Sequence, residues 1–168
     1  FRIVKAQGGS IRVYVAHKNQ KKISQKINKQ IQIEKNKLQL LKSSSFILFE
    51  KKIILVKKKL NELLHKLKKS NKTIIGYGAA AKTTTLLNYF DINKDTISFI
   101  VDDNFLKQKK FTPGTHIPIK ASNYIYKTNV DYIIILAWNY SSHIINLHQK
   151  FKKRGGKFIV PFPKIKII

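Results

Sequence analysis

The stretch "IIGYGAAAKTTTLLNYF" contains residues at spacings that suit phosphate binding. Gly76, Gly78 and Ala81 fit the G-x-G-x-x-G/A pattern of a dinucleotide-binding turn, which joins a strand to a helix. In such a turn the first glycine permits a tight bend, the second lets a ligand approach the backbone, and the helix start presents free N–H groups to an anion. We therefore expect the backbone N–H groups around Gly78–Ala80, Ala79 among them, to face a phosphate group.

The same residues also fit, with one departure, the phosphate-binding loop of NTPases, G-x-x-x-x-G-K-[ST]. Ala81 stands at the second glycine of that pattern and is followed by Lys82 and Thr83. Because alanine has a β-carbon, it resists the positive φ that a glycine adopts there. The sequence thus favours a Rossmann-type turn over an NTPase, with Lys82 adding a point charge beside a phosphate. A close-packed turn without a ligand is the alternative interpretation.

Other candidate binding residues follow predicted strands or lie in a loop. Asp102 follows a strand at about the distance from the glycines at which a dinucleotide fold places its ribose-binding carboxylate. Trp138 and Asn139 also follow a strand, and we expect them to line a cleft by stacking and hydrogen bonding. A tryptophan that only closes the core is the alternative. His116, in the loop "FTPGTHIPI", can donate to a phosphate or a sugar, or bond to its own loop backbone.

Short apolar runs alternate with helical patterns from residue 73 onward, which is typical of an α/β fold. The pattern predicts a Rossmann-like open parallel sheet with flanking helices. Its elements are strands at 73–76, 96–103, 131–138 and 157–163, helices at 79–90 and 141–155, and a loop at 104–119. The inward-facing apolar positions predict a core of Ile74, Ile75, Leu86, Leu87, Ile97, Phe99, Ile133, Ile135, Ile144, Leu147 and Phe158.

The residues before this sheet predict a β-hairpin and a long helix pair. Residues 1–17 alternate apolar and polar side chains around two glycines, as in a hairpin. Apolar residues at helical spacing predict a helix at 18–42 and a longer one at 43–71, capped by Ser45, whose apolar seam favours packing over a coiled coil. The expected domains are a hairpin at 1–17, a helical connector at 18–70 and a Rossmann-like domain at 71–168.

The chain is strongly basic. Its formal net charge is +26, from 34 Lys and Arg against 8 Asp and Glu, yet only Arg2, Arg12 and Arg154 are arginines. Proteins that recognise bases and phosphates favour arginine for its bidentate fork, so a solvated lysine-rich surface is favoured over a nucleic-acid interface. A basic nucleic-acid-binding or scaffold module stays open as the alternative function.

Cysteine is absent, which excludes disulfides, thiolate zinc sites and a cysteine nucleophile, and fits a cytoplasmic protein. His143 and His148 lack the i, i+4 spacing of a helical metal pair, so no metal site is expected. No uncharged run reaches the length of a membrane span and no signal peptide is recognisable, so we expect no membrane contact. The chain begins without Met, as a part of a longer protein would.

Several motifs, taken together and in order, resemble those of one enzyme family. They resemble the C-terminal region of the S-adenosylmethionine-dependent sugar C-methyltransferases, from about Gly8 to Pro163. The motifs are "GGSIRVYVAH", "GYGAAAK", "LLNYF", "FIVDDN…KQKKFTPGTHIPI", "DYIIILAWNY" and "RGGKFIVPFP". The resemblance implies that the substrate is a nucleotide-activated deoxysugar, methylated at carbon. It also implies that this domain is Rossmann-like and helps to shape the substrate cleft.

The resemblance further implies a chain that works only with a partner. Family members carry S-adenosylmethionine and a catalytic Glu-His motif in a methyltransferase domain, which a zinc domain precedes. This chain resembles the domain that follows them, with residues 1–17 as the closing hairpin of the methyltransferase domain, supplied in cis or in trans. We therefore expect no catalytic residue here, no cofactor bound by this chain alone, and a nucleotide-diphosphate sugar as ligand. One departure is that Thr83 and Thr84 follow Lys82, where a small residue is expected.

Overall fold

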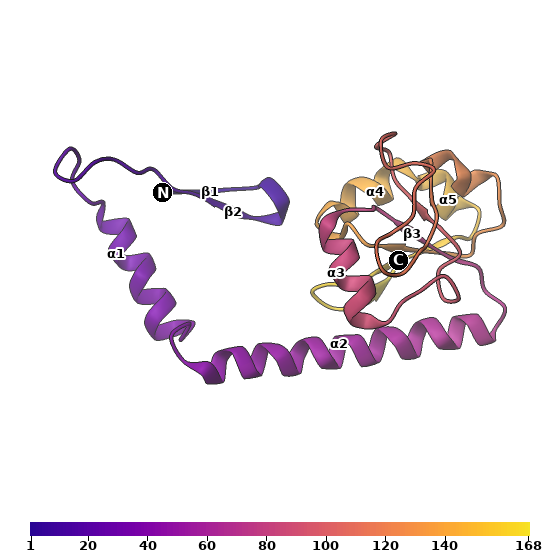
Figure 1. Ribbon diagram of the computed structural model, residues 1–168, viewed down its shortest axis with the longest axis horizontal. Helices are drawn as coiled ribbons and strands as arrows, with labels where there is room; N and C mark the ends of the chain where they lie inside the picture. The colour runs from indigo at the N-terminus through magenta and orange to yellow at the C-terminus, as the bar shows by residue number, and fades with distance from the viewer. The chain divides into compact units, whose positions relative to one another are not determined.

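The computed structural model describes residues 1–168, except for the side chain of Gln7. The chain divides into two compact units, Phe1–Ile54 and Leu55–Ile168, which are described separately (Figure 1). This division falls inside one long helix, α2 (Ser43–Lys69), whereas the sequence suggests boundaries after residues 17 and 70. The three-domain division therefore stays a prediction.

The first unit begins with the predicted hairpin. Strands β1 (Arg2–Val4) and β2 (Ser10–Arg12) pair antiparallel with Ile3 opposite Ile11, and a 3-10 turn at Ala6–Gly8 joins them. The second strand ends at Arg12, so the longer strand expected to reach residue 17 is wrong. The first strand of this two-stranded hairpin is short, so the alternating residues after Arg12 have no partner strand to pair with.

Helical structure in the first unit starts later than predicted. Ser24 accepts a hydrogen bond from the Lys26 N–H and caps α1 (Gln25–Gln32), which continues as a π-helical turn, Ile33–Lys37. The helix expected from residue 18 is therefore too long. Ser45 is not a cap either: it lies inside α2 and its hydroxyl donates to the Gln39 carbonyl.

The second unit is built on a six-stranded sheet. The strand order is β5-β4-β3-β6-β7-β8, with the first five strands parallel and β8 antiparallel to β7. The strands are β3 (Ile74–Tyr77), β4 (Ile100–Val101), β5 (Ile119–Lys120), β6 (Tyr132–Ile135), β7 (Lys157–Val160) and β8 (Lys166–Ile167). The predicted α/β class with a mostly parallel sheet is confirmed. The chain runs outward from β3 in one direction and from β6 in the other, so the topological switch point lies between these two strands.

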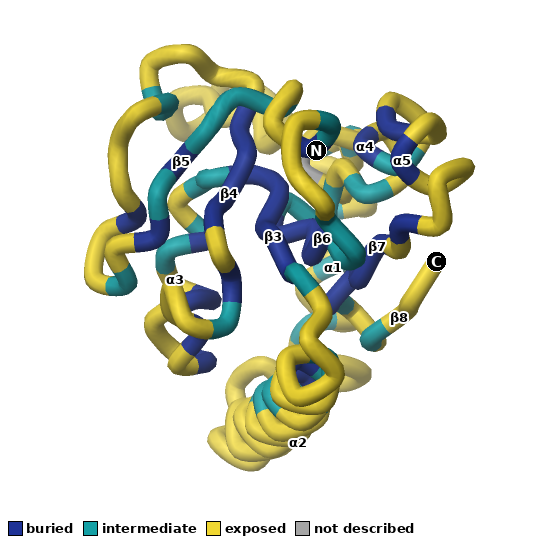
Figure 2. The backbone as a smooth tube through the Cα atoms, turned by 90° about the vertical axis from the view of Figure 1, so that its right-hand side faces the viewer, coloured by how far each residue is buried: buried dark blue, intermediate teal, exposed yellow. Residues whose placement is uncertain are grey.

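Helices cover both faces of this sheet. One face carries helix α3 (Ala81–Phe90) and the second half of α2, whose Leu60 and Leu64 are buried. The Asn61 side-chain amide joins these two helices by donating to the Phe90 carbonyl. The other face carries the short 3-10 helix η3 (Ser122–Tyr126) with α4 (Ser141–Leu147) and α5 (Gln149–Lys153). Figure 2 shows the buried backbone concentrated along β3, β4, β6 and β7.

The predicted core is confirmed except at Leu147, which is 57% exposed. The helix expected at 141–155 breaks at His148, so α4 and α5 are separate. His148 and Phe151 turn inward at the break and Leu147 turns outward. Strands β5 and β8 and the helix η3 were not predicted, because elements of two to five residues are too short to show a periodicity.

No helix in the described part of the chain combines the length and the apolar character that a membrane span requires.

Candidate functional site

The two glycines of the β3–α3 turn are required by close packing. Gly78 has φ +97°, and a β-carbon placed on it would lie 2.6 Å from the Cβ of Ala137. A β-carbon on Gly76 would lie 2.7 Å from Leu136 Cδ1 and 2.8 Å from Ile100 Cγ1. Both residues therefore let β3 lie against its neighbours β4 and β6, and the protein's own side chains fill the space beside them.

Asp102 ties the turn to the end of β4. Its Oδ2 accepts from the Ala79 N–H at 2.7 Å and lies 3.3 Å from the Lys107 ammonium, and its Oδ1 accepts from the Asn104 N–H at 2.9 Å. Asp102 is only 8% exposed. The N–H that the sequence assigns to a phosphate is thus bonded to the carboxylate that the sequence assigns to a ribose.

Thr83 closes the same turn from the helix side. Its buried hydroxyl donates to the Gly78 carbonyl at 2.7 Å and accepts from the Ala80 N–H at 3.3 Å, while the Gly78 N–H donates to the Val101 carbonyl. Because Ala80, at the N-cap, has no side-chain acceptor, Thr83 provides the only side-chain cap that the described residues give this helix end. Thr83, which stands where a small residue is expected, therefore stabilises this turn.

The donors that remain lie in the first turn of α3. Within the described structure the N–H groups of Ala81 and Lys82 have no hydrogen-bond partner, as expected for the first positions of a helix. The Lys82 ammonium lies 5.3 Å from the centre of the Trp138 ring, across the switch point. Trp138 is partly buried against Phe162, with 4.8 Å between ring centres. These groups form a cationic, aromatic-walled end to α3.

Beside this turn lies a chain of polar side chains that the sequence did not indicate. The Tyr77 hydroxyl donates to Asp103 Oδ2 at 2.7 Å, His148 Nε2 lies 3.1 Å from that hydroxyl, and the Tyr126 hydroxyl lies 3.0 Å from His148 Nδ1. Burial, together with the nearby Asp103 carboxylate, raises the pKa of Tyr77, and burial lowers the pKa of His148. Tyr77 and His148 are 71 positions apart, so only the fold brings them together.

The chain is similar in sequence to known proteins. The profile of the family described as C-methyltransferase C-terminal domain matches residues 5–163, nearly the whole chain. The chain belongs to this family. It is also 37% identical, over 113 residues, to the C-methyltransferase NovU of Streptomyces niveus. The match covers 67% of this chain and 27% of that relative, so this C-methyltransferase C-terminal domain spans about a quarter of the relative's length.

The structure brings together all but one of the predicted site residues. Gly76, Gly78, Ala79, Lys82, Asp102 and Trp138 meet at the carboxyl ends of β3, β4 and β6, and Asn139 follows Trp138 in the 3-10 turn η4 (Trp138–Tyr140). His116 lies elsewhere. It has φ +51°, its N–H donates to the Thr112 carbonyl, and its loop is held to the second half of α3 by Asn88, which donates to the Pro113 carbonyl.

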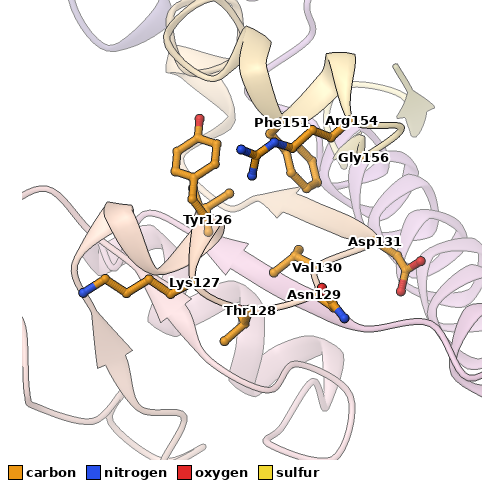
Figure 3. Close-up of a pocket in the computed structure, with 10 residues that line it drawn as sticks. Tyr126, Lys127, Thr128, Asn129, Val130, Asp131, Phe151, Arg154 and Gly156 are labelled. Carbon is orange, nitrogen blue, oxygen red and sulfur yellow. The ribbon is translucent and has the colours of Figure 1, made fainter.

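One pocket of the C-methyltransferase C-terminal domain lies away from the glycine turn. It has a volume of about 280 Å³ and lies at the amino-terminal ends of β6 and β7 (Figure 3). The Arg154 guanidinium stands 5.6 Å from the centre of the Tyr126 ring at one side of it. Asp131, on its rim, is bonded to the Thr73 N–H and to Lys72. Asp131 therefore connects the rim of the pocket to the segment before β3.

Within the described residues, no three His, Asp or Glu side chains form a group that could hold a metal ion. The glycine turn does not fit S-adenosylmethionine, because Ala137 occupies the approach to Gly78 and Asp102 occupies the Ala79 N–H.

Proposed function

We propose that this domain forms part of the substrate cleft of an S-adenosylmethionine-dependent C-methyltransferase that acts on a nucleotide-activated sugar. The family match over residues 5–163 carries the proposal. The open end of α3 beside the switch point supports it, because open α/β sheets bind ligands beyond the carboxyl ends of their strands. A cytoplasmic location belongs to the same proposal.

In this proposal the diphosphate of the nucleotide sugar binds at the first turn of α3. The Ala81 and Lys82 N–H groups lack partners among the described residues, and the helix macrodipole adds a partial positive charge there. The Lys82 ammonium contributes a full charge beside them, and the Trp138 ring offers a face on which a base or a sugar can stack. Gly76, Gly78, Ala79 and Asp102 shape this end of the sheet, and we leave His116 out of the site.

Methyl transfer itself belongs, in this proposal, to a partner domain. S-adenosylmethionine and the catalytic base are supplied by a methyltransferase domain, because the turn described above does not fit the donor and we assign no catalytic residue here. The apolar side chains that 1–54 exposes, such as Ile11 and Val13, are surfaces that such a domain can cover.

A binding experiment tests the diphosphate site. Chemical-shift titration with a nucleotide-diphosphate sugar should give weak binding, about millimolar, and Lys82→Ala should weaken it about five- to thirtyfold, the scale of one charge-assisted hydrogen bond. The matched control is Lys153→Ala, an exposed lysine on α5, which removes the same charge elsewhere and should leave the affinity unchanged. Equal losses in both variants would contradict a local site. Gly78 is unsuitable for this test because any side chain there meets Ala137.

An activity experiment tests the division of labour. With labelled S-adenosylmethionine and nucleotide-sugar substrates, the isolated chain should incorporate no label. Incorporation by this chain alone would overturn the proposed role. The basic nucleic-acid or scaffold module is not favoured, since the family match covers nearly all of the chain. That module predicts equal binding of diphosphate, sulfate and DNA, lost together as salt rises.

A further inference from the structure

Two carboxylates follow β4, and the structure separates their roles. We propose that Asp103, and not Asp102, accepts hydrogen bonds from hydroxyl groups of the nucleotide sugar. Tyr77, His148 and Tyr126 are positioning residues that fix this carboxylate. The inference rests on the proposed function and names the residue that recognises the sugar portion of that ligand.

Asp102 has little left to offer a ligand. Both of its oxygens accept backbone N–H groups, those of Ala79 and Asn104, and Lys107 lies against one of them. With 8% of its surface exposed, Asp102 would have to give up a buried hydrogen bond before a hydroxyl could replace it. Its position in the sequence suits a ribose-binding carboxylate, but its contacts are those of a brace.

Asp103 has the opposite environment. It is exposed, at the same edge of the sheet, and its Oδ2 accepts from the Tyr77 hydroxyl at 2.7 Å. No partner for Oδ1 is found among the residues that the structure describes. Because an ionised carboxylate can accept about four hydrogen bonds, Asp103 keeps free acceptor sites beyond the end of β4. Hydroxyl groups of a pentose or a hexose are the donors that suit such an acceptor.

The hydrogen-bonded chain behind Asp103 has one consistent direction at neutral pH. An ionised carboxylate only accepts, so the Tyr77 hydroxyl donates to it. The Tyr77 oxygen can then accept from His148 Nε2–H, which leaves His148 Nδ1 to accept from the Tyr126 hydroxyl. Burial favours the neutral imidazole that this arrangement requires, because it lowers the pKa of His148.

The rings of this chain are also fixed by packing. Tyr77 and His148 are 4% and 5% exposed, and their rings meet edge to face with 5.2 Å between centres. Four polar groups from β3, the end of β4, η3 and the α4–α5 junction are thus held in one geometry that ends at an exposed carboxylate. Hydrogen bonds among packed side chains hold those side chains rigidly, which is what a binding residue requires of its supports.

The test uses the full chain with UDP-glucose, UDP, thymidine diphosphate glucose and inorganic diphosphate as probes. Asp103→Asn should weaken UDP-glucose binding about tenfold and leave inorganic diphosphate binding unchanged, because only the sugars carry hydroxyl donors. A loss that persists with UDP but not with thymidine diphosphate glucose assigns the ribose 2′-hydroxyl, which thymidine lacks, and a loss that persists with both probes assigns the 3′-hydroxyl. If Asp103→Asn weakens the binding of UDP-glucose but not that of UDP, Asp103 contacts the hexose. The matched control, Asp95→Asn, removes an exposed charge at the far end of α3 and should change nothing.

The positioning role is tested by Tyr77→Phe, which removes the hydroxyl and keeps the ring. In the chain that keeps Asp103, this change should weaken UDP-glucose binding about threefold. In the Asp103→Asn variant it should have no further effect, because the two residues act together. A loss of stability without any change in affinity would overturn the positioning role.

The outcomes separate the two proposals. If the unaltered chain binds UDP-glucose, Lys82→Ala weakens it and Asp103→Asn does not, the Asp103 inference is wrong and the proposed function stands. Equal weakening of UDP-glucose and inorganic diphosphate by Asp103→Asn would also overturn the inference. If no probe that contains a nucleotide sugar binds the unaltered chain, the proposed function itself fails, and the inference with it.

Discussion

The two units of this chain place apolar residues on strands with opposite results. In the second unit, strand residues such as Ile133 and Phe158 are fully buried. In the first unit no residue whose burial is described is buried, and Ile11 and Val15 are 54% and 90% exposed. An alternating pattern therefore predicts a strand and its apolar face, whereas burial requires a second layer to cover that face.

The difference has a physical origin. A two-stranded hairpin and a helix of eight residues are marginal in water, because most of their stability comes from packing. The sheet unit packs helices on both faces and has its own core. The comparison teaches that stability in this chain is concentrated in residues 55–168.

The largest expected effect on stability comes from truncating a buried side chain of the sheet unit, and the matched truncation in the first unit should have almost none. Phe158→Ala should lower the free energy of unfolding by about 3–5 kcal/mol, because it removes a ring that is 0% exposed and leaves a cavity. Phe49→Ala, in the exposed part of α2, should change it by less than about 0.5 kcal/mol. Urea unfolding followed by circular dichroism, which reports on the helices and strands of both units, measures both. Similar losses in the two variants would erase the contrast.

A smaller effect should come from the cap of α3. Thr83→Ala should cost about 1–2 kcal/mol, because it removes the hydroxyl that bonds the Gly78 carbonyl and the Ala80 N–H. Thr85→Ala, an exposed threonine two residues on, is the matched control and should be nearly neutral. Thermal unfolding of both variants is the measurement, and equal melting temperatures would show that the buried hydroxyl braces nothing.

The pH dependence of stability should come from the sheet unit. Burial lowers the pKa of His148 below its ordinary value of 6.5, and the Asp103 charge acts in the opposite, lesser sense. The unfolded chain therefore binds a proton that the folded chain resists, so stability is complete above pH 6.5 and is lost as the pH falls through the folded-state pKa. Urea midpoints between pH 7.5 and 5 measure this loss. His148→Gln should flatten the curve in that window, and an unchanged slope would show that another group titrates.

The smallest effect is expected from removing the hairpin. Deleting residues 1–24 should change the free energy of unfolding of the sheet unit by less than about 0.5 kcal/mol, since independent regions contribute additively. Trp138 lies in the second unit and reports its unfolding selectively. A loss of several kcal/mol would mean that the two units unfold as one cooperative body and that stability is not concentrated in residues 55–168.

For the candidate site, the glycine spacing predicted a turn that the structure contains, and the structure adds contacts that the spacing does not show. The spacing of Gly76 and Gly78 indicates a strand-to-helix turn, because those positions need residues without a β-carbon, and the turn is there. It could not show that Leu136, Ile100 and Ala137 are the neighbours that require the glycines. It could not distinguish Asp102 from Asp103 either, since adjacent carboxylates look equivalent until one of them is bonded to a distant N–H.

What the sequence determined by itself was local: the α/β class, the faces of the strands and helices, and nearly all of the core. These follow from periodicity, which is a property of neighbouring residues. The tertiary structure alone decided where His116 lies, why the helix at 141–155 breaks, and how Tyr77, Asp103, Tyr126 and His148 meet. Those contacts join residues far apart in the chain, and their energies depend on burial and distance, which no spacing along the sequence encodes.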